Sequence, residues 1–196
     1  SGKALYGLSD EELRFEVKKH APDMVGISCM YTAYSTDAHR VAKIVKGVNR
    51  GIMVAMGGAY ASAFPAVVSK DVNVDAVVHS EGEETFLALV KCVESRGDFS
   101  TVAGITFRNS DGRIVVNPER GFIKDLDSIP FPARHLLDMS LYLEKQPGPY
   151  AMRWPSSTII TSRGCPNACA YCTIKFVWGS HRWRGRSAGN VVDEIE

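Results

Sequence analysis

Residues 52–58 read Ile-Met-Val-Ala-Met-Gly-Gly, an apolar run that stops at two glycines. Two further apolar runs occupy residues 24–28 (Met-Val-Gly-Ile-Ser) and 75–78 (Asp-Ala-Val-Val). Strands that are apolar throughout, and are separated by helical segments, are typical of a parallel sheet covered on both faces. The runs therefore predict an α/β fold over residues 1–100, a partial Rossmann-like, flavodoxin-like sheet.

Helical segments alternate with these runs. Ser9-Asp-Glu-Glu12 has the pattern of a capping box, which opens a helix that ends near His20. Further helices are predicted from Ser35-Thr-Asp37 to Gly51, around residues 63–69, and over residues 83–95. Because a helix rather than a strand comes first, we expect at least one βα unit before residue 1 in the parent protein.

The carboxyl ends of the three strands are the expected ligand site, because doubly wound sheets bind ligands there. Ser28, Met30, Gly57, Gly58 and Gly82 lie at these ends. A glycine pair can form a tight turn or allow close approach of a flat ligand, and the neighbouring strand ends favour a ligand pocket. The nearby acidic residues 81, 83 and 84 are interpreted as a loop and a favourable helix N-terminus.

The second half of the chain has a different pattern. Residues 104–116 alternate around Asp111-Gly112, which predicts a β-hairpin. We assign residues 101–153 to this hairpin and an extended linker, marked by 129–132 and by Gln146-Pro-Gly-Pro149. Ser157–Thr161 is predicted to begin a new strand, and residues 189–196 to begin a helix.

Three cysteines, Cys165, Cys169 and Cys172, follow that predicted strand with the spacing C-x3-C-x2-C. Thiolates so close together are suited to one soft metal centre. An iron–sulfur cluster is favoured, and zinc with His181 as fourth ligand is the alternative. Tyr171 could cover one face of a cofactor. The other two cysteines, Cys29 and Cys92, are interpreted as buried packing residues.

The run Cys165-x3-Cys169-x-Tyr171-Cys172 resembles the signature of the radical S-adenosylmethionine (radical SAM) enzymes. The resemblance implies that the three cysteines hold a [4Fe-4S] cluster whose fourth iron binds S-adenosyl-L-methionine. It further implies reductive cleavage of this cofactor to a 5′-deoxyadenosyl radical. Residues 154–196 would then be the N-terminal piece of a radical SAM (β/α) barrel, with the cluster loop.

Residues 22–28, 57–62 and 74–85 resemble the cobalamin (B12)-binding domain that precedes many radical SAM cores. By this resemblance Ser28 hydrogen-bonds the nucleotide tail of cobalamin, and Gly57 and Gly58 leave room for it. The family's usual His in the stretch that follows the glycines is Tyr60 here, and the resemblance implies that Tyr60 contributes to the cofactor site. The D-x-H-x-x-G segment of some cobalamin proteins does not occur in this sequence.

The resemblance implies part of a cobalamin-dependent radical SAM enzyme, truncated at both ends. Methyl transfer or oxidative cyclisation at an unactivated carbon of a small molecule is expected, with an external electron donor of the flavodoxin or ferredoxin type. The parent would be an enzyme, and residues 1–196 alone would be inactive. The competing interpretations are a cobalamin carrier or sensor without catalysis, and a zinc-binding interaction module.

Composition excludes several other classes. The formal net charge is +1, with 45% hydrophobic and 23% charged residues, so no overall field points to nucleic acid. The basic run Arg182-Trp-Arg-Gly-Arg186 is too short to change this, and we interpret it as a loop near the cluster. No apolar run approaches the roughly 20 residues of a membrane span. Clustered cysteines favour a reducing compartment, so a cytoplasmic location is expected.

Overall fold

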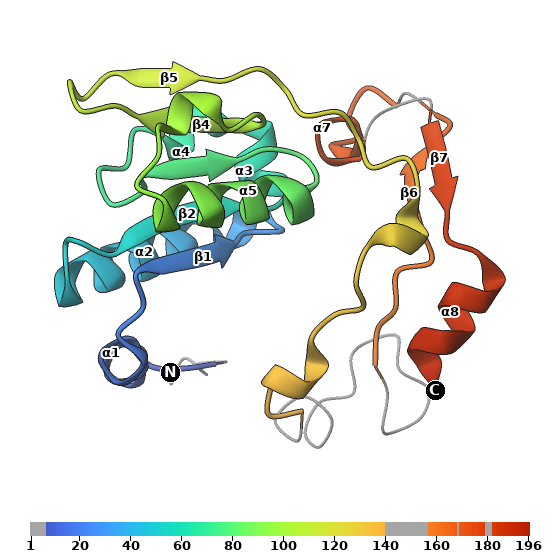
Figure 1. Cartoon of the computed structure of the whole chain (residues 1–196), viewed down its shortest axis with the longest axis horizontal. Coiled ribbons are helices and arrows are strands. Elements are labelled where there is room, and N and C mark those ends of the chain that lie inside the picture. Colours follow the sequence, from blue (N-terminus) through green and yellow to red (C-terminus); the bar gives the residue numbers. More distant parts are fainter. Residues whose placement is uncertain (1–6, 140–156, 168, 179–181) are drawn as a thin grey trace.

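A computed structural model describes residues 7–139, 157–167, 169–178 and 182–196, and its first half forms a five-stranded mixed sheet with helices, on the left in Figure 1. The strand order is β1-β2-β3-β4-β5. The bounds are β1 Met24–Ser28, β2 Met53–Gly57, β3 Ala76–Val78, β4 Ile105–Arg108 and β5 Ile114–Val116. The first three strands run parallel, as the apolar runs predict, and Met24 to Ser28 of β1 pair with Met53 to Gly57 of β2.

Helices cover both faces of the sheet. On one face lie α1 (Asp10–His20), α2 (Ser35–Val48), α3 (Ala59–Ala63) and α4 (Pro65–Val68), and on the other lies α5 (Gly82–Glu94). Val45 of α2 packs with Val54 on the first face, and Leu89 of α5 packs with Ala55 on the second. The side chains of β2 thus alternate between two cores, which confirms the predicted doubly covered sheet.

The helix boundaries follow local chemistry. The predicted capping box is present at α1: Glu12 N–H donates to Ser9 Oγ, and the Glu12 carboxylate accepts from Ser9 N–H. The helix predicted around residues 63–69 is instead two short helices, α3 and α4, with Pro65 at the start of the second. Short 3-10 helices occupy Thr32–Tyr34, Phe99–Thr101, Leu126–Ser128 and Arg134–Leu136.

The predicted hairpin is part of the main sheet. Gly112, at φ 76°, closes the turn by donating to the carbonyl of Asn109 over 2.9 Å. Strand β4 lies antiparallel beside β3, with Val77 paired to Thr106. Ile105 and Phe107 are buried in the same core as Leu89. The hairpin therefore extends the α/β core, although the sequence placed it in a separate segment with the linker.

The C-terminal segment folds beyond the carboxyl ends of β1 to β3, toward which their arrows point (Figure 1). It contains β6 (Ser162–Cys165), α7 (Ile174–Val177), β7 (Arg182–Gly185) and α8 (Ala188–Ile195). Strands β6 and β7 form a separate antiparallel pair. The predicted helix start near residue 189 is confirmed by α8, where Asn190 N–H donates to Ser187 Oγ.

The strand predicted at Ser157–Thr161 is wrong. These residues have no regular structure, and β6 begins at Ser162 instead. Ile159 and Ile160 suggested a buried strand, yet pairing with β7 decides where the strand lies. The linker stretch at 146–149 lies outside the described residues.

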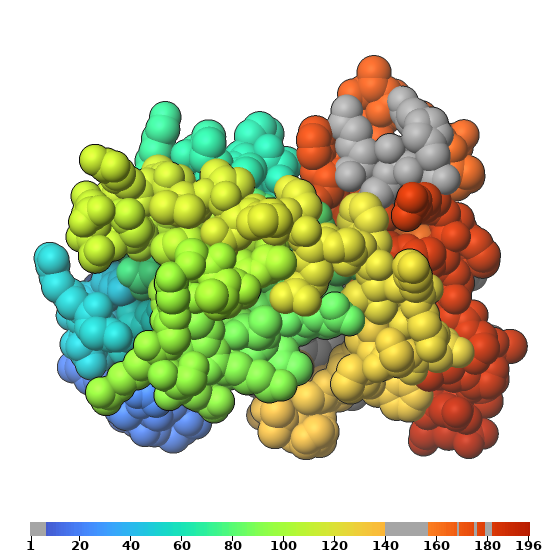
Figure 2. All heavy atoms as spheres, turned by 45° about the horizontal axis from the view of Figure 1, so that its top comes forward, coloured from blue at the N-terminus to red at the C-terminus, as the bar shows by residue number. Residues whose placement is uncertain are grey.

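The connector, residues 117–139, lies between the sheet and the C-terminal segment. It packs against both of them, as the space-filling view shows in yellow and orange (Figure 2). No helix among the described residues is long and apolar enough to cross a membrane.

Candidate cofactor site

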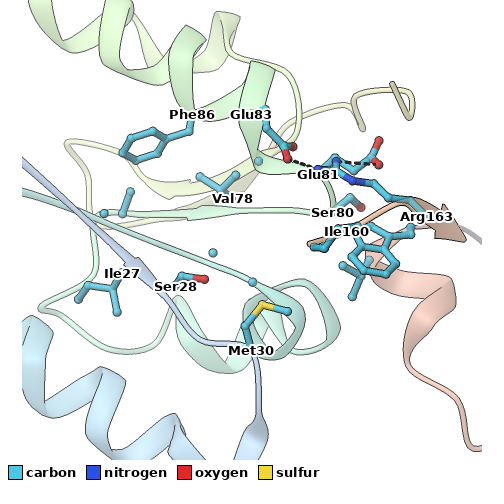
Figure 3. A pocket seen from close by; sticks show the side chains of 17 residues that line it. Ile27, Ser28, Met30, Val78, Ser80, Glu81, Glu83, Phe86, Ile160 and Arg163 are labelled. Atoms are coloured by element: carbon cyan, nitrogen blue, oxygen red, sulfur yellow. Dashed lines mark hydrogen bonds and ion pairs between the residues drawn. The ribbon is translucent and has the colours of Figure 1, made fainter. Parts of the chain in front are cut away.

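A cavity of about 500 Å³ lies at the carboxyl ends of β1, β2 and β3, and the C-terminal segment forms its far wall (Figure 3). Such a volume is typical of small-molecule and cofactor sites. The lining is mostly apolar. Its residues are Gly26, Ile27, Ser28, Met30, Ala55, Gly57, Gly58, Val78, Ser80, Glu81, Gly82, Glu83, Phe86, Ile160, Arg163, Val177 and Trp178.

Five of the predicted cofactor residues line this cavity: Ser28, Met30, Gly57, Gly58 and Gly82. They come from three different loops, because the parallel strands bring their carboxyl ends to one edge of the sheet. Ser28 and Met30 are exposed, and their side chains face the open space (Figure 3). Ser28 is therefore available to hydrogen-bond a ligand.

A side chain at Gly57 and a side chain at Gly58 would have different consequences. Gly58 has φ 93°, and a Cβ there would lie 2.6 Å from the carbonyl oxygen of Cys29. It is required by the backbone itself, whatever binds nearby. At Gly57 a Cβ would make only ordinary contacts, the nearest 3.6 Å from Val78. Gly57 is therefore the glycine whose missing side chain leaves cavity volume.

Tyr60 and Tyr171, the other two predicted cofactor residues, do not line the cavity. Tyr60 is buried on α3, where its hydroxyl lies 3.3 Å from Nε2 of His39. Nδ1 of the same histidine lies 2.6 Å from Asp71. Burial raises the pKa of Asp71, but hydrogen bonds from Asn73 and His39 outweigh it and leave this pKa lowered. Tyr60 thus joins α2 to α3 inside the core, whereas Tyr171 is 90% exposed.

Ser62 supports two cavity-lining residues without lining the cavity itself, a role that the sequence interpretation missed. Its hydroxyl donates to the carbonyl of Gly58 and accepts from the N–H of Ser80, each over 2.9 Å. It thereby ties the loop after β2 to the loop after β3. Ser80 has a left-handed backbone, with φ 54°, and its own hydroxyl donates to the carbonyl of Phe176 in α7.

Phe86 was also missed. Its ring lies on α5 against the backbone of Gly26, where an added Cβ would come within 2.9 Å of the ring. Both residues line the cavity, so the ring forms part of its apolar wall (Figure 3). The glycine within the otherwise apolar run 24–28 was the available signal, because a strand glycine often marks such a close approach.

A charged rim, formed by Glu81, Glu83 and Arg163, borders the cavity on the side of the cysteine segment. Arg163 of β6 donates to Glu81 over 3.2 Å and to Glu83 over 2.5 Å. Burial raises the pKa of Glu83, but the hydrogen bond and charge of Arg163 outweigh it and lower this pKa. The two acidic residues sit at a strand-end loop and a helix N-terminus, as interpreted from the sequence, and they also hold ion pairs. Arg184 of β7, from the basic run, donates to Glu81 as well, over 2.9 Å.

The three loop cysteines are free thiols, and Cys165 lies two residues after Arg163 on β6. Cys165 ends β6, and the N–H of Cys172 donates to the carbonyl of Cys169 over 3.1 Å. Among the described residues no group of three or more His, Cys, Asp or Glu side chains is placed to hold a metal ion. His181, the fourth ligand of the zinc alternative, lies outside the described residues.

Cys29 and Cys92 differ from the loop cysteines. Both are buried free thiols, as predicted, with 2% and 8% of their surface exposed. Burial raises the pKa of both thiols. Neither is suited to bind metal as a thiolate.

The residues present fit the predicted cofactors in different ways. For cobalamin, the cavity is large enough for a nucleotide tail, and Gly57 leaves a space that a Cβ would fill. For a cluster, the donor set is chemically suitable, because three free thiols lie within eight residues. Their side chains do not converge on one point in this structure. Convergence would have to accompany binding, as is common where metal binding and loop folding are coupled.

Several known proteins resemble this chain in sequence and in fold. Residues 6–90 match the B12 binding domain family. The chain is 34% identical to cytidylyl-2-hydroxyethylphosphonate methyltransferase of Streptomyces wedmorensis, over 97% of this chain and 40% of that protein. It is 32% identical to anaerobic magnesium-protoporphyrin IX monomethyl ester cyclase of Rubrivivax gelatinosus, over 96% of this chain and 33% of that protein.

Solved structures show the same fold. The cobalamin-dependent S-adenosylmethionine radical enzyme OxsB, with aqua-cobalamin and S-adenosylmethionine bound, has a TM-score of 0.73 at 18% identity, over 96% of this chain and 25% of that chain. The radical S-adenosylmethionine methyltransferase TsrM from Kitasatospora setae has a TM-score of 0.67 at 16% identity, over 95% of this chain and 37% of that chain.

Residues 6–90 therefore match the B12 binding domain family, the chain is similar in sequence to a methyltransferase and a cyclase, and its fold is that of the solved enzymes OxsB and TsrM. It spans between a third and two fifths of the length of the two curated relatives described above.

Proposed function

We propose that this chain is the cobalamin-binding and cluster-binding part of a radical SAM enzyme that modifies an unactivated carbon of a small molecule. One observation carries the proposal: Arg163, which lines the far side of the cavity at the strand ends, lies two residues before Cys165 on β6. A cobalamin site and a cluster loop would then face each other across a short distance.

The proposed role of the cavity is to hold the nucleotide tail of cobalamin. Ser28 would donate a hydrogen bond to the tail, and Gly57 and Gly82 would leave room for it. Phe86 and Val78 would exclude water from its apolar parts. Met30, half-exposed at the rim, would lie nearest to the part of the ligand that projects from the cavity.

The proposed role of the loop is to supply three thiolates, from Cys165, Cys169 and Cys172, to a [4Fe-4S] cluster. When bound, such a cluster with one iron free of protein ligands supplies the electron for cleavage of S-adenosyl-L-methionine to a 5′-deoxyadenosyl radical. Tyr171, fully on the surface here, would cover one side of it. An external donor of the flavodoxin or ferredoxin type would deliver the electron, in the cytoplasm.

Methyl transfer is favoured over oxidative cyclisation as the parent reaction, because the chain is 34% identical to the Streptomyces methyltransferase and 35% identical to the uncharacterized methyltransferase PH0819 of Pyrococcus horikoshii. The 32% identical cyclase keeps the second reaction in consideration. The substrate would be bound by parts of the protein beyond this chain.

The test is anaerobic reconstitution of the full-length protein, followed by metal and cobalamin analysis. About four iron and four sulfide per chain and one cobalamin are expected. Replacing Cys165, Cys169 and Cys172 together by Ala should remove the iron and sulfide and leave cobalamin bound. The matched control is Cys29→Ala with Cys92→Ala, which should keep both.

Three results would contradict parts of the proposal. Zinc without iron or sulfide would favour the interaction module. Cobalamin binding with neither iron nor zinc would favour the carrier or sensor. Iron and sulfide without cobalamin would remove the role assigned to the cavity.

A further inference from the structure

Two arginines lie directly opposite each other on the strand pair that carries the cysteine loop. Arg163 of β6 is paired in register with Arg184 of β7. Their side chains are only 13% and 12% exposed. Like charges in this cross-strand position destabilise a pair of strands, and partial burial increases the effect. The β6–β7 pair therefore needs an anion beside it.

Glu81 supplies that anion from the other half of the molecule. It lies between β3 and α5, and its side chain is 3% exposed. Its carboxylate accepts from Arg163 over 3.2 Å, from Arg184 over 2.9 Å and from the backbone N–H of Ile123 over 2.7 Å. A single side chain thus joins the sheet, the connector and both strands of the cysteine-bearing pair, and Figure 3 shows its contact with Arg163.

The same residue borders the cavity. Glu81 and its neighbour Gly82 line it together with Arg163, and Arg163 is two residues before Cys165 on β6. Arg163 therefore links the cavity wall, through its ion pairs with Glu81 and Glu83, to the first cysteine two residues further along β6.

A second buried carboxylate offers a contrast. Glu194 of α8 is also 3% exposed and also lies between two arginines, Arg134 and Arg186. Its partners belong to the connector and to the segment after β7. Its ion pairs therefore stay within the second half of the chain, while those of Glu81 cross to the sheet.

We infer that Glu81 is a positioning residue that holds the β6–β7 pair against the strand ends of the sheet and so fixes the spacing between the cavity and the cysteine loop. The inference rests on the proposed function in one respect: the two groups whose spacing Glu81 would fix are cobalamin and the iron–sulfur cluster. The ion pairs themselves are independent of it.

The test compares E81Q, E81D and the matched control E194Q in the full-length protein. Hydrogen exchange of peptides covering 162–165 and 182–185 is measured first, without added cofactors. E81Q, which keeps the shape but removes the charge, should increase exchange in both peptides at least tenfold and leave α2 unchanged. E81D should give an intermediate increase. E194Q should leave peptide 162–165 within twofold of wild type.

The spacing is then measured in reconstituted protein, as the pulsed electron paramagnetic resonance distance between cob(II)alamin and the reduced cluster. E81Q should retain iron and cobalamin to within twofold of wild type and broaden the distance distribution, whereas E194Q should not. A merely structural contribution to folding would lower the content of both cofactors and leave the distance in the loaded fraction unchanged.

Unchanged exchange at 162–165 in E81Q, or an unchanged distance, would overturn the inference. If E81Q does not fold, E81D carries both comparisons, and exchange at 162–165 or a distance that is unchanged from wild type in E81D overturns the inference. If wild-type protein binds no iron or no cobalamin, the proposed function fails, but the exchange result still decides whether Glu81 holds the strand pair.

Discussion

At Gly58 the backbone leaves no room for a side chain, because φ is 93° and the Cys29 carbonyl lies 2.6 Å from the position of a Cβ. Gly58→Ala should therefore lower the free energy of unfolding by about 2–4 kcal/mol, through strain and overpacking together. Chemical denaturation of the two proteins measures it.

Gly57→Ala is the matched variant, because its Cβ would meet Val78 at an ordinary 3.6 Å. It should change the free energy of unfolding by less than about 1 kcal/mol. Since the new methyl group enters the cavity, it should weaken cobalamin binding about tenfold. Equal losses of stability in the two variants would show that Gly58 has no special backbone role.

His79 gives the fold a pH dependence. It is buried after β3, with Nε2 2.8 Å from the hydroxyl of Thr106. Burial lowers the pKa of His79 below its ordinary value, against the opposing charge of Glu119. In the window from about pH 6.5 down to the folded-state pKa, the unfolded chain binds the proton and the folded chain does not, so stability falls as the pH falls.

His79→Gln should flatten this dependence. Between pH 7.5 and 5.5 the free energy of unfolding of wild type should fall more than that of the variant, measured by denaturation at each pH. Carboxylates with lowered pKa, such as Asp71 and Glu83, titrate below this range and affect both proteins alike. Parallel curves would contradict the assignment.

Residue-scale roles were predictable only where the cause is local. Ser28 and Gly57 were placed at the cavity because a strand end is visible in the sequence. Glu81 was interpreted as part of a helix N-terminus, because its partner Arg163 is 82 residues away and no periodicity relates the two. Tyr60 was predicted to meet the cofactor from its place in a motif, but its ring turns into the core toward His39.

At the scale of elements, one hydroxyl joins two strand ends. Ser62→Ala removes the bonds to Gly58 and Ser80 and should cost about 1–2 kcal/mol of stability. It should also weaken cobalamin binding, because both loops line the cavity. Ser69→Ala, which removes a bond to Pro65 away from the cavity, is the control and should affect stability alone. Isothermal titration and denaturation measure the two effects.

Element boundaries were predictable where capping and turn residues set them. The Ser9–Glu12 box and the turn at Asp111-Gly112 are examples. The pairing of β3 with β4 was not predictable, because either edge of a sheet can accept a hairpin and the pattern of one strand does not name its neighbour. The position of β6 was missed for the same reason: Ser-Arg-Gly-Cys becomes a strand only through its pairing with β7.

At the scale of the molecule, the chain spans 40% and 33% of the two curated relatives, and the proposed function assigns most of a barrel of about 200 residues or more to the full-length protein. Residues 1–196 alone should therefore release no 5′-deoxyadenosine from S-adenosyl-L-methionine under anaerobic reducing conditions, while the full-length protein should. Chromatography of the reaction mixtures measures this. Release of 5′-deoxyadenosine by residues 1–196 alone would refute the expectation that the rest of the full-length protein is needed for this reaction.

The overall architecture was predictable further than the arrangement of the site. Apolar runs separated by helices were sufficient for the doubly covered sheet, because burial on both faces determines residue type along the whole strand. The position of the cysteine segment against that sheet depends on long-range ion pairs. A single sequence does not show which charged residues form these pairs.

Two of the five thiols lie in the core and three lie in the cluster loop, so their reactivity can be used to measure how much of the protein holds a cluster. Cys29 and Cys92 are shielded, and Cys169 is exposed. An alkylating reagent applied briefly to native protein should label free loop thiols and spare the buried ones. Loop thiols that hold a cluster would stay unlabelled, so mass spectrometry of an impure extract could report the fraction of protein with a bound cluster.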